Sequence, residues 1–591
     1  MKTIYKSIFI IGLGVVSLTA SAQKKDSTLT RQVMLEREYT PTMQDASRVN
    51  LTPNIYSPVI KPKEIKFVST TPQVSLQHNQ LGASASGDIK TDVLFDKKRG
   101  YLSIGAGSHG NIEGAAGVRI VDMERDRLDL FVTHSSTSGT VDYIDGDDFV
   151  SKDVKAKYMD TKANLQYEHI FTPSVLSLGV SYNNKSYNYY GNSFLPSTFG
   201  GAFPYEYNTK QGVDVFNVGA GLRSSEQYEG FLKYMVNLNY SYFKNKYGLE
   251  TTDNVSGGQL NADVDFFTEF GADKTIGIRG GIMNQSFSDK VKLIENAYHG
   301  YTNITGNPYI RFQGANWDAE LGLSLSALFD VKTAFNVSPN VKFNVHVNDV
   351  NTFYAEVGGG VNNNTFLDIL QENRYVNLAT RVEYSKTLYD AKAGFRSGVV
   401  PGLEFDIFAG YKHTRKDHLY VATAAGQWAN MGSPLYADVS TGHIGGLLKT
   451  KLIPMTTLSA KIVGYFYNVK YKDGYVSVIE KDVFSEKKAW GRPSFTAELN
   501  ADVQPFDKLT LSLNYLYAGG RKGVTLNANS SLGPDAKMND INELNFRGEY
   551  RITDWVSVNA RLNNILFQKY ELQYGYPLQG FNILGGLSFK F

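Results

Sequence analysis

The chain has 591 residues, a formal net charge of +2 and no cysteine. The small net charge gives no indication of a nucleic-acid partner, and the lack of cysteine excludes thiolate metal sites and cysteine nucleophiles. Glycine (55), tyrosine (38) and phenylalanine (34) are abundant although the mean hydropathy is only −0.28, a combination expected where oily and wet residues alternate.

The first 22 residues have the features of a secretory signal peptide. Lys2 and Lys6 supply a positive start, Ile8–Leu18 is an apolar core, and Ala20–Ala22 forms an A-x-A cleavage site. The core is too short for a transmembrane helix, which needs about 20 apolar residues. We therefore expect residues 1–22 to be removed and the protein to be exported.

Residues 23–99 are rich in proline, with five of the 17 prolines in the chain. This segment mixes charged, aromatic and β-branched residues, unlike a flexible Gly/Ser linker. Two interpretations remain open. The segment is a disordered periplasmic tether, or it is an extended peptide that enters a barrel lumen or docks on a periplasmic or lipoprotein partner by strand addition.

From about residue 100 onward, apolar and polar residues alternate with a period of two, the pattern of strands with one oily and one wet face. Clear examples are Leu176–Asn183, Leu232–Tyr242, Trp317–Ala327 and Lys508–Tyr517. The wet faces extend over about 8–12 residues, near the length of a tilted membrane-spanning strand. Helical periodicity is almost absent.

Short turns and longer loops alternate between these strands. Candidate turns fall at 123–127, 171–174, 225–229, 271–275, 314–317, 348–351, 399–402, 452–455, 504–507 and 551–554. Their spacing leaves room for two strands and one long loop between successive turns. With one further pair at each end, the count is about 22 strands. We predict an all-β fold, a transmembrane antiparallel outer-membrane β-barrel over residues 100–591.

Apart from Leu584, the sequence FNILGGLSFKF at Phe581–Phe591 places its aromatic and aliphatic residues on one face of a strand. We expect that face to contact outer-membrane lipid. The strand has to pair with the first one, near Gly100–Ser108, because an open sheet edge cannot exist in hydrocarbon. We also expect the outer-membrane assembly machinery to bind this terminal strand.

Two stretches carry a resemblance to a known family. RLNNILFQKYELQYGYPLQGFNILGGLSFKF (Arg561–Phe591) and YSKTLYDAKAGFRSGVVPGLEFDIFAGYKH (Tyr384–His413) resemble strand-loop-strand blocks of TonB-dependent receptor barrels. The resemblance implies such a barrel over residues 100–591. It does not extend to the family's N-terminal plug domain, because residues 23–99 are too few and too rich in proline. STLTRQVMLEREY (Ser27–Tyr39) matches the family's energy-coupling box poorly, so energised transport is not implied.

Two clusters of candidate metal ligands occur. DYIDGDD gathers Asp142, Asp145, Asp147 and Asp148, but it lacks the order and closing Glu of an EF-hand, and we interpret it as a solvated acidic loop. HTRKDH brings His413 and His418 close together, but zinc needs three or four ligands, and we interpret this stretch as a strand-to-loop junction. We predict no metal, cofactor-binding or catalytic residues.

Tyrosines and lumen charges are the remaining candidates for a ligand site. Tyrosines gather near predicted strand ends, at Tyr182, Tyr187, Tyr189, Tyr190, Tyr240, Tyr242, Tyr247, Tyr465, Tyr467, Tyr471 and Tyr475. An aromatic girdle at the membrane interface explains most of them without a ligand. The charges expected to face the lumen include Lys233, Asp318, Glu320, Lys461 and Arg561. Their mixed signs indicate no particular substrate.

The sequence supports two functions. A barrel of this size encloses a lumen that has to be plugged. We expect an outer-membrane protein that transports a solute or gates its passage. The alternative is a structural or assembly subunit of an envelope complex that docks a periplasmic or lipoprotein partner through residues 23–99. No G-x-S-x-G or H-E-x-x-H motif occurs, and we do not expect an enzyme.

Overall fold

The computed structural model describes most of the chain from residue 98 onward. The described residues are 98–145, 148–191, 210–246, 254–271, 273–288, 300–330, 332–378, 382–423, 431–471, 488–526 and 535–591. The predicted signal peptide, nearly all of the proline-rich segment and the stretch Ser27–Tyr39 lie outside these residues.

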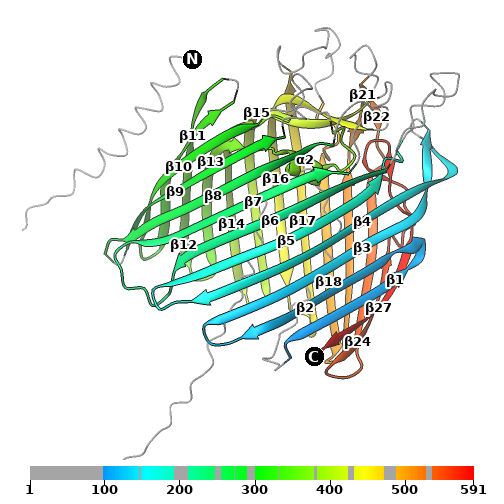
Figure 1. The fold of residues 1–591 in the computed structure, drawn as a ribbon, viewed down its shortest axis with the longest axis horizontal. Coiled ribbons are helices and arrows are strands. Elements are labelled where there is room, and N and C mark those ends of the chain that lie inside the picture. Colours follow the sequence, from blue (N-terminus) through cyan, green and yellow to red (C-terminus); the bar gives the residue numbers. More distant parts are fainter. Residues whose placement is uncertain are drawn as a thin grey trace, which may run out of the picture. The chain divides into compact units, whose positions relative to one another are not determined.

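Twenty-two antiparallel strands form one closed sheet, so the predicted fold class is confirmed (Figure 1). Each strand pairs with its neighbour in sequence, as in bacterial outer-membrane barrels. The strands are β1 (Gly100–Gly107), β2 (Ile112–Asp122), β3 (Asp126–Asp145), β4 (Asp148–Ile170), β5 (Ser174–Asn188), β6 (Lys210–Ser224), β7 (Lys233–Asn245), β8 (Ser256–Glu269), β9 (Lys274–Phe287), β10 (Tyr301–Gln313), β11 (Trp317–Phe329), β12 (Ala334–Asn348), β13 (Asn351–Asn362), β14 (Ser385–Val400), β15 (Leu403–Thr423), β16 (Gly432–Thr450), β17 (Thr456–Lys470), β18 (Phe495–Phe506), β19 (Leu509–Gly519), β23 (Ile541–Arg551), β24 (Val556–Asn563) and β27 (Asn582–Lys590).

The first and last strands close the barrel, as predicted. Residues Tyr101–Gly107 of β1 pair with residues Leu584–Lys590 of β27 in antiparallel register. Next to this ladder, Gly100 and Phe591 exchange two backbone hydrogen bonds of 2.8 and 2.9 Å. Gly586 permits a close approach here, because a Cβ atom at this position would lie 2.6 Å from the carbonyl oxygen of Ile104. The closed ladder leaves neither strand with a free edge.

All ten predicted turns connect adjacent strands at one rim, which we call the short-turn rim. The turn at 123–127 joins β2 to β3 and the turn at 551–554 joins β23 to β24. The opposite rim, the long-loop rim, carries the longer connections, such as the 22 residues between β13 and β14 (363–384). The predicted additional pairs are β1 with β2 and β24 with β27.

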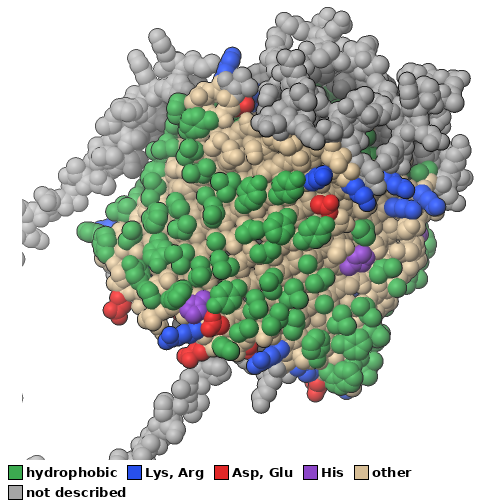
Figure 2. All heavy atoms as spheres, in the orientation of Figure 1, with side chains coloured by type: hydrophobic (Ala, Val, Ile, Leu, Met, Phe, Trp, Pro, Cys, Tyr) green, Lys and Arg blue, Asp and Glu red, His purple; other side chains and the backbone are tan. Residues whose placement is uncertain are grey.

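The outer face of the wall is apolar. Alternate residues such as Leu178, Leu323 and Ile583 are exposed on it, and Phe591 has an exposed fraction of 62%. On the face shown in Figure 2, hydrophobic side chains cover the wall between the rims, whereas most charged side chains lie near the rims. This distribution is that of a lipid-facing barrel surface.

The described residues also contain small elements outside the barrel wall. They are the 3-10 turn η1 (Ser108–Gly110), helix α2 (Phe366–Glu372) and the short strands β20 (Lys522–Gly523), β21 (Thr525–Leu526), β22 (Ala536–Lys537), β25 (Glu571–Gln573) and β26 (Tyr576–Pro577). Strand β21 pairs in parallel with the end of β15. Within the described ranges, no helix has the length and apolar character needed to cross a membrane.

Candidate functional site

A short helix at the long-loop rim organises the candidate site. Helix α2 belongs to the connection between β13 and β14, and we call residues 363–384 the cap segment. A capping box starts the helix: the Thr365 hydroxyl accepts from the Asp368 N–H (3.2 Å), and the Asp368 carboxylate accepts from the Thr365 N–H (2.9 Å). Burial raises the pKa of the Asp368 carboxyl, and the hydrogen bonds from Thr365 only partly offset this effect.

The start of the cap segment packs against the wall at β7 and β9. The ring of Phe366 lies 5.1 Å from that of Phe243 and 5.9 Å from that of Phe287, measured between centroids. The side-chain carbonyl of Gln285 accepts a hydrogen bond of 2.7 Å from the Phe366 N–H. Further buried apolar side chains of the cap segment, among them Ile369, Leu370 and Leu378, continue this cluster. This side of the cap segment is thus fixed by apolar contact.

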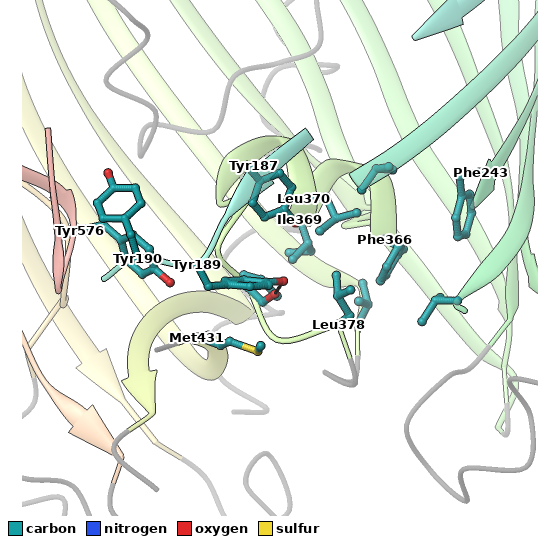
Figure 3. Close-up of a cluster of buried hydrophobic side chains, with 14 of the residues drawn as sticks. Tyr187, Tyr189, Tyr190, Phe243, Phe366, Ile369, Leu370, Leu378, Met431 and Tyr576 are labelled. Carbon is teal, nitrogen blue, oxygen red and sulfur yellow. Dashed lines mark hydrogen bonds between the residues drawn. The ribbon is translucent and has the colours of Figure 1, made fainter. Parts of the chain in front are cut away.

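The middle of the cap segment meets residues next to the wall on the opposite side of the mouth. The ring of Tyr375 stacks on that of Tyr576 at 3.7 Å with an interplanar angle of 9°, and Tyr190 packs edge-on against both rings. The Tyr189 hydroxyl donates to the Val376 carbonyl oxygen (3.2 Å). Figure 3 shows Phe243 at one end of the cluster and Tyr190 and Tyr576 at the other, with the side chains of α2 between them.

The position of these contacts around the barrel shows how far the cap segment reaches. It leaves the wall between the thirteenth and fourteenth strands, β13 and β14. Tyr189 and Tyr190 follow the fifth strand, β5, and Tyr576 precedes the twenty-second, β27. Both contacts lie about eight strands away, in opposite directions around a ring of 22. The cap segment therefore crosses the mouth of the barrel.

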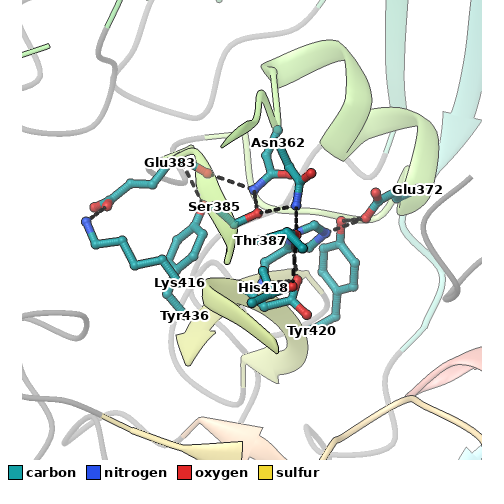
Figure 4. Close-up of polar contacts among 12 residues, drawn as sticks. Asn362, Glu372, Glu383, Ser385, Thr387, Lys416, His418, Tyr420 and Tyr436 are labelled. Carbon is teal, nitrogen blue, oxygen red and sulfur yellow. Dashed lines mark hydrogen bonds and ion pairs between the residues drawn. The ribbon is translucent and has the colours of Figure 1, made fainter. Parts of the chain in front are cut away.

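A β-bulge directs the upper part of β15 toward the cap segment. The register between β15 and β16 shifts between Thr414 and Asp417. Lys416, at the bulge, has a φ of +51°, a conformation that residues other than glycine seldom adopt. Its ammonium group forms an ion pair with Glu383 of the cap segment (Figure 4).

Beyond the bulge, a buried polar cluster attaches α2 to β15. Glu372 Oε2 lies 2.6 Å from His418 Nε2 and 2.8 Å from the Tyr420 hydroxyl (Figure 4). The Arg492 guanidinium donates to Asp417 Oδ2 (2.8 Å) and to the His418 carbonyl oxygen (3.1 Å). Burial opposes the charge of Arg492, but the attraction of Asp417 outweighs it and raises the pKa of the guanidinium.

The tyrosines singled out in the sequence divide into two groups. Exposed on the outer wall, as an aromatic girdle requires, are Tyr182, Tyr240 and Tyr242. Buried or partly buried in clusters at the long-loop rim are Tyr187, Tyr189, Tyr190, Tyr467 and Tyr471. For this second group the girdle interpretation is wrong, because strand ends and loops fold into the mouth. Tyr465 stacks beside Tyr467, and Tyr247 and Tyr475 lie outside the described residues.

The histidine pair does not lie at a strand-to-loop junction, so that prediction is wrong. His413 and His418 both belong to β15, which continues through the bulge to Thr423. They have different partners: His413 Nδ1 lies 2.8 Å from the Ser440 hydroxyl, whereas His418 contacts Glu372. Among the described residues, no group of three or more His, Cys, Asp or Glu side chains is placed to hold a metal ion.

The acidic stretch lies at the tip of a hairpin and not in a long loop. Strand β3 runs to Asp145 and β4 begins at Asp148, with these two residues opposite each other in the register. Asp142 forms an ion pair with Lys569. Asp147 is outside the described residues.

Most of the five lumen charges named from the sequence have partners on nearby strands. The ion pairs are Lys233 with Glu269, Glu320 with Arg279 and Arg311, and Arg561 with Glu113. Asp318 Oδ1 lies 2.9 Å from His346 Nε2. Lys461 lies opposite Glu498 in the register of β17 and β18. The wall of the lumen is thus polar, with charges of opposite sign beside one another.

The cap segment itself was not identified from the sequence. The stretch TFLDILQE (Thr365–Glu372) contains the available signal, a Thr-x-x-Asp capping box with apolar Phe366, Ile369 and Leu370 at helical spacing. Its partners, such as Tyr576 of β26, are far away in sequence, and no local pattern points to them.

Comparison with known proteins identifies relatives in fold. No protein-family model matches the chain, and no curated protein matches it. Among solved structures, a point mutant of the ferric enterobactin receptor PfeA of Pseudomonas aeruginosa has a TM-score of 0.61 at 11% identity, covering 84% of this chain and 80% of that chain. The outer-membrane ferripyoverdine receptor of the same organism, bound to ferripyoverdine, has a TM-score of 0.58 at 13% identity, with coverage of 84% and 72%. The FpvAI–pyocin S2 complex has a TM-score of 0.59 at 12% identity, with coverage of 84% and 73%. These solved structures are TonB-dependent receptors, so the barrel part of the sequence resemblance is confirmed at the level of the fold.

Proposed function

We propose that this protein is an outer-membrane β-barrel that gates the passage of a solute, with the cap segment as the gate on the extracellular side. The observation that supports this most is the path of the cap segment, which leaves one side of the wall and contacts the opposite side. Long loops face outward in bacterial barrels, so the cap segment would close the lumen from outside. The shared fold with receptors named for enterobactin and pyoverdine supports the same class of function.

The two sides of the cap segment differ in a way that suits a gate. Phe366 is held against β7 and β9 by apolar packing, close to the point where the chain leaves β13. The far side is held by the Tyr375–Tyr576 stack and a hydrogen bond from Tyr189. Such contacts contribute about 0.5–1.5 kcal/mol each. A sum of a few kcal/mol lies in the range over which a ligand can shift a two-state equilibrium.

A structural or assembly subunit is the second candidate, and the buried cluster on β15 favours it. The largely buried Glu372 carboxylate of the cap segment contacts His418 and the Tyr420 hydroxyl, and leaving a buried charged group without its partners costs about 3–5 kcal/mol. A cap segment held by such contacts would keep the mouth permanently closed. In that case residues 23–99 would dock a periplasmic or lipoprotein partner.

Conductance of the full-length protein in a planar bilayer separates the two candidates. The chain has no cysteine, so Tyr375→Cys with Tyr576→Cys can be joined by a short bis-maleimide without other reaction. If the cap segment is a gate, the uncross-linked protein switches between closed and open states, and cross-linking abolishes the open state. A second variant, with residues 367–378 replaced by a Gly/Ser linker, should conduct continuously. A protein that stays closed with or without the cross-linker, and conducts only after the replacement, contradicts gating and supports the subunit role.

The role of residues 23–99 has its own test. The native particle is extracted in mild detergent with and without residues 23–72, and its mass and composition are measured. A stoichiometric partner that is lost on truncation supports the docking role. A barrel without a partner, whose conductance rises on truncation, supports a role of this segment as the plug of the lumen.

A further inference from the structure

Arg374, directly after helix α2, has no anionic partner among the described residues. Its guanidinium carbon lies 3.8 Å from the ring centroid of Tyr158 on β4 and 5.9 Å from that of Tyr375. It forms no ion pair and no hydrogen bond within the part of the chain that the structure describes. A guanidinium carries five N–H donors and is always charged, so this group lacks the acceptors that usually surround it.

The neighbouring wall adds two more cations to this place. Tyr158, Asp160 and Lys162 alternate along β4 and therefore point to the same side, and Lys185 of β5 lies opposite Asp160 in the register. That side is the lumen, because Tyr182 of β5, of opposite parity to Lys185, is exposed on the outer wall. Along this face, Asp160 and then Lys162 follow Tyr158 toward the short-turn rim.

The charges at this place do not balance. Asp160 is the one carboxylate among these side chains; it lies 3.9 Å from the Lys185 ammonium and accepts a 3.0 Å hydrogen bond from the Tyr158 hydroxyl. The residues beside them on β3 and β6 are uncharged: Thr133, Ser135, Val213 and Val215. Three cations thus face one anion. Elsewhere on the lumen wall, Arg279 and Arg311 share Glu320, and Lys233 pairs with Glu269.

We propose that Arg374, Lys185 and Lys162 form a binding site for the carboxylate or phosphate group of an anionic solute in the lumen. This inference rests on the proposed function, since it names the class of solute that the gate would admit. The planar fork of Arg374 suits two acceptor oxygens at once, and the lysines supply point charges from the wall. Because Arg374 belongs to the cap segment and the lysines to the wall, a bound anion would contact both, and its binding is thereby coupled to the position of the cap segment.

The test is isothermal titration calorimetry of the full-length protein in detergent, with sodium phosphate and sodium citrate as probes at constant ionic strength. Glycerol serves as the uncharged probe. We expect saturable binding of at least one anion by the wild type. Arg374→Gln and Lys185→Gln should each weaken it at least tenfold. The matched control is Lys157→Gln, an exposed position on the same strand whose side chain points away from the lumen.

Each outcome decides the proposal. Binding of citrate but not phosphate, or the reverse, supports the site and identifies the oxyanion that it prefers. Absence of binding by the wild type, or equal binding by Arg374→Gln, overturns the site. Equal weakening in Lys157→Gln shows general charge attraction and also overturns it. If Arg374→Gln does not fold, Lys162→Gln at an exposed wall position replaces it. Calorimetry does not require conductance, so a failure of gating remains distinguishable from a failure of anion binding.

Discussion

At the scale of single residues, the start of helix α2 depends on Thr365. Its hydroxyl accepts the hydrogen bond that would otherwise be missing from a buried helix end. We expect Thr365→Ala to cost about 1 kcal/mol of local stability. Amide hydrogen exchange of residues 366–373, followed by mass spectrometry, should accelerate about fivefold. Thr268→Ala at the short-turn rim is the control. Faster exchange of the α2 amides in this control, or unchanged exchange in Thr365→Ala, would contradict the role of Thr365 as the N-cap of α2.

Asp368 makes the stability of the cap segment dependent on pH. Burial raises the pKa of its carboxyl in the folded state. A raised pKa means that the favourable contribution is present below the unfolded pKa, near 4, and is lost as the pH rises through the folded value. We expect Asp368→Asn to slow exchange of the α2 amides relative to the wild type at pH 7, with little difference at pH 3.5. A variant that exchanges faster at both pH values would show that the negative charge stabilises the helix start.

At the scale of elements, the bulge in β15 places Lys416 against the cap segment. Between Thr414 and Asp417, β15 has one residue more than the facing stretch of β16. We expect deletion of Lys416 to restore a regular ladder in which His418 still lies opposite Tyr436, while the ion pair with Glu383 is lost. Conductance should then show more frequent opening. Lys416→Gly keeps the bulge but removes the same ion pair, so it should open as often as the deletion variant. An intact closed state in both variants would contradict a role of the ion pair in holding the cap segment.

Local sequence patterns predicted the strands and turns of the barrel but not the cap segment. Strands and turns are local patterns, and alternation such as that of Leu321, Leu323 and Leu325 was sufficient to place all ten turns. The cap segment depends on contacts between residues far apart, such as Tyr375 with Tyr576, which leave no periodic trace. Tyr187 and Tyr242 both stand near strand ends, yet one is buried in the mouth and the other is exposed. That difference is set by where each loop folds, which composition does not encode.

At the scale of the whole molecule, barrel closure depends on the close approach of β1 and β27. A methyl group at Gly586 would lie 2.6 Å from the Ile104 carbonyl oxygen, whereas at Gly585 the nearest atom is 4.0 Å away. We expect Gly586→Ala to impair closure and Gly585→Ala to fold normally. The readout is heat-modifiable migration in electrophoresis, which reports the folded barrel. Equal yields of folded protein from both variants would contradict the steric argument.

The pairing of Tyr101 with Lys590 also has a consequence for the order of folding. These two residues stand near opposite ends of the barrel sequence, so their pairing is among the contacts with the greatest sequence separation in the barrel. Hairpins such as β11–β12 can form as soon as their own residues are present, but the ring cannot close until its last strand has been synthesised and delivered. Until then β1 has an unpaired edge that other chains could extend. The slow step of biogenesis should therefore be the joining of the two ends, and a catalyst that holds β1 and β27 apart from other strands would act at that step.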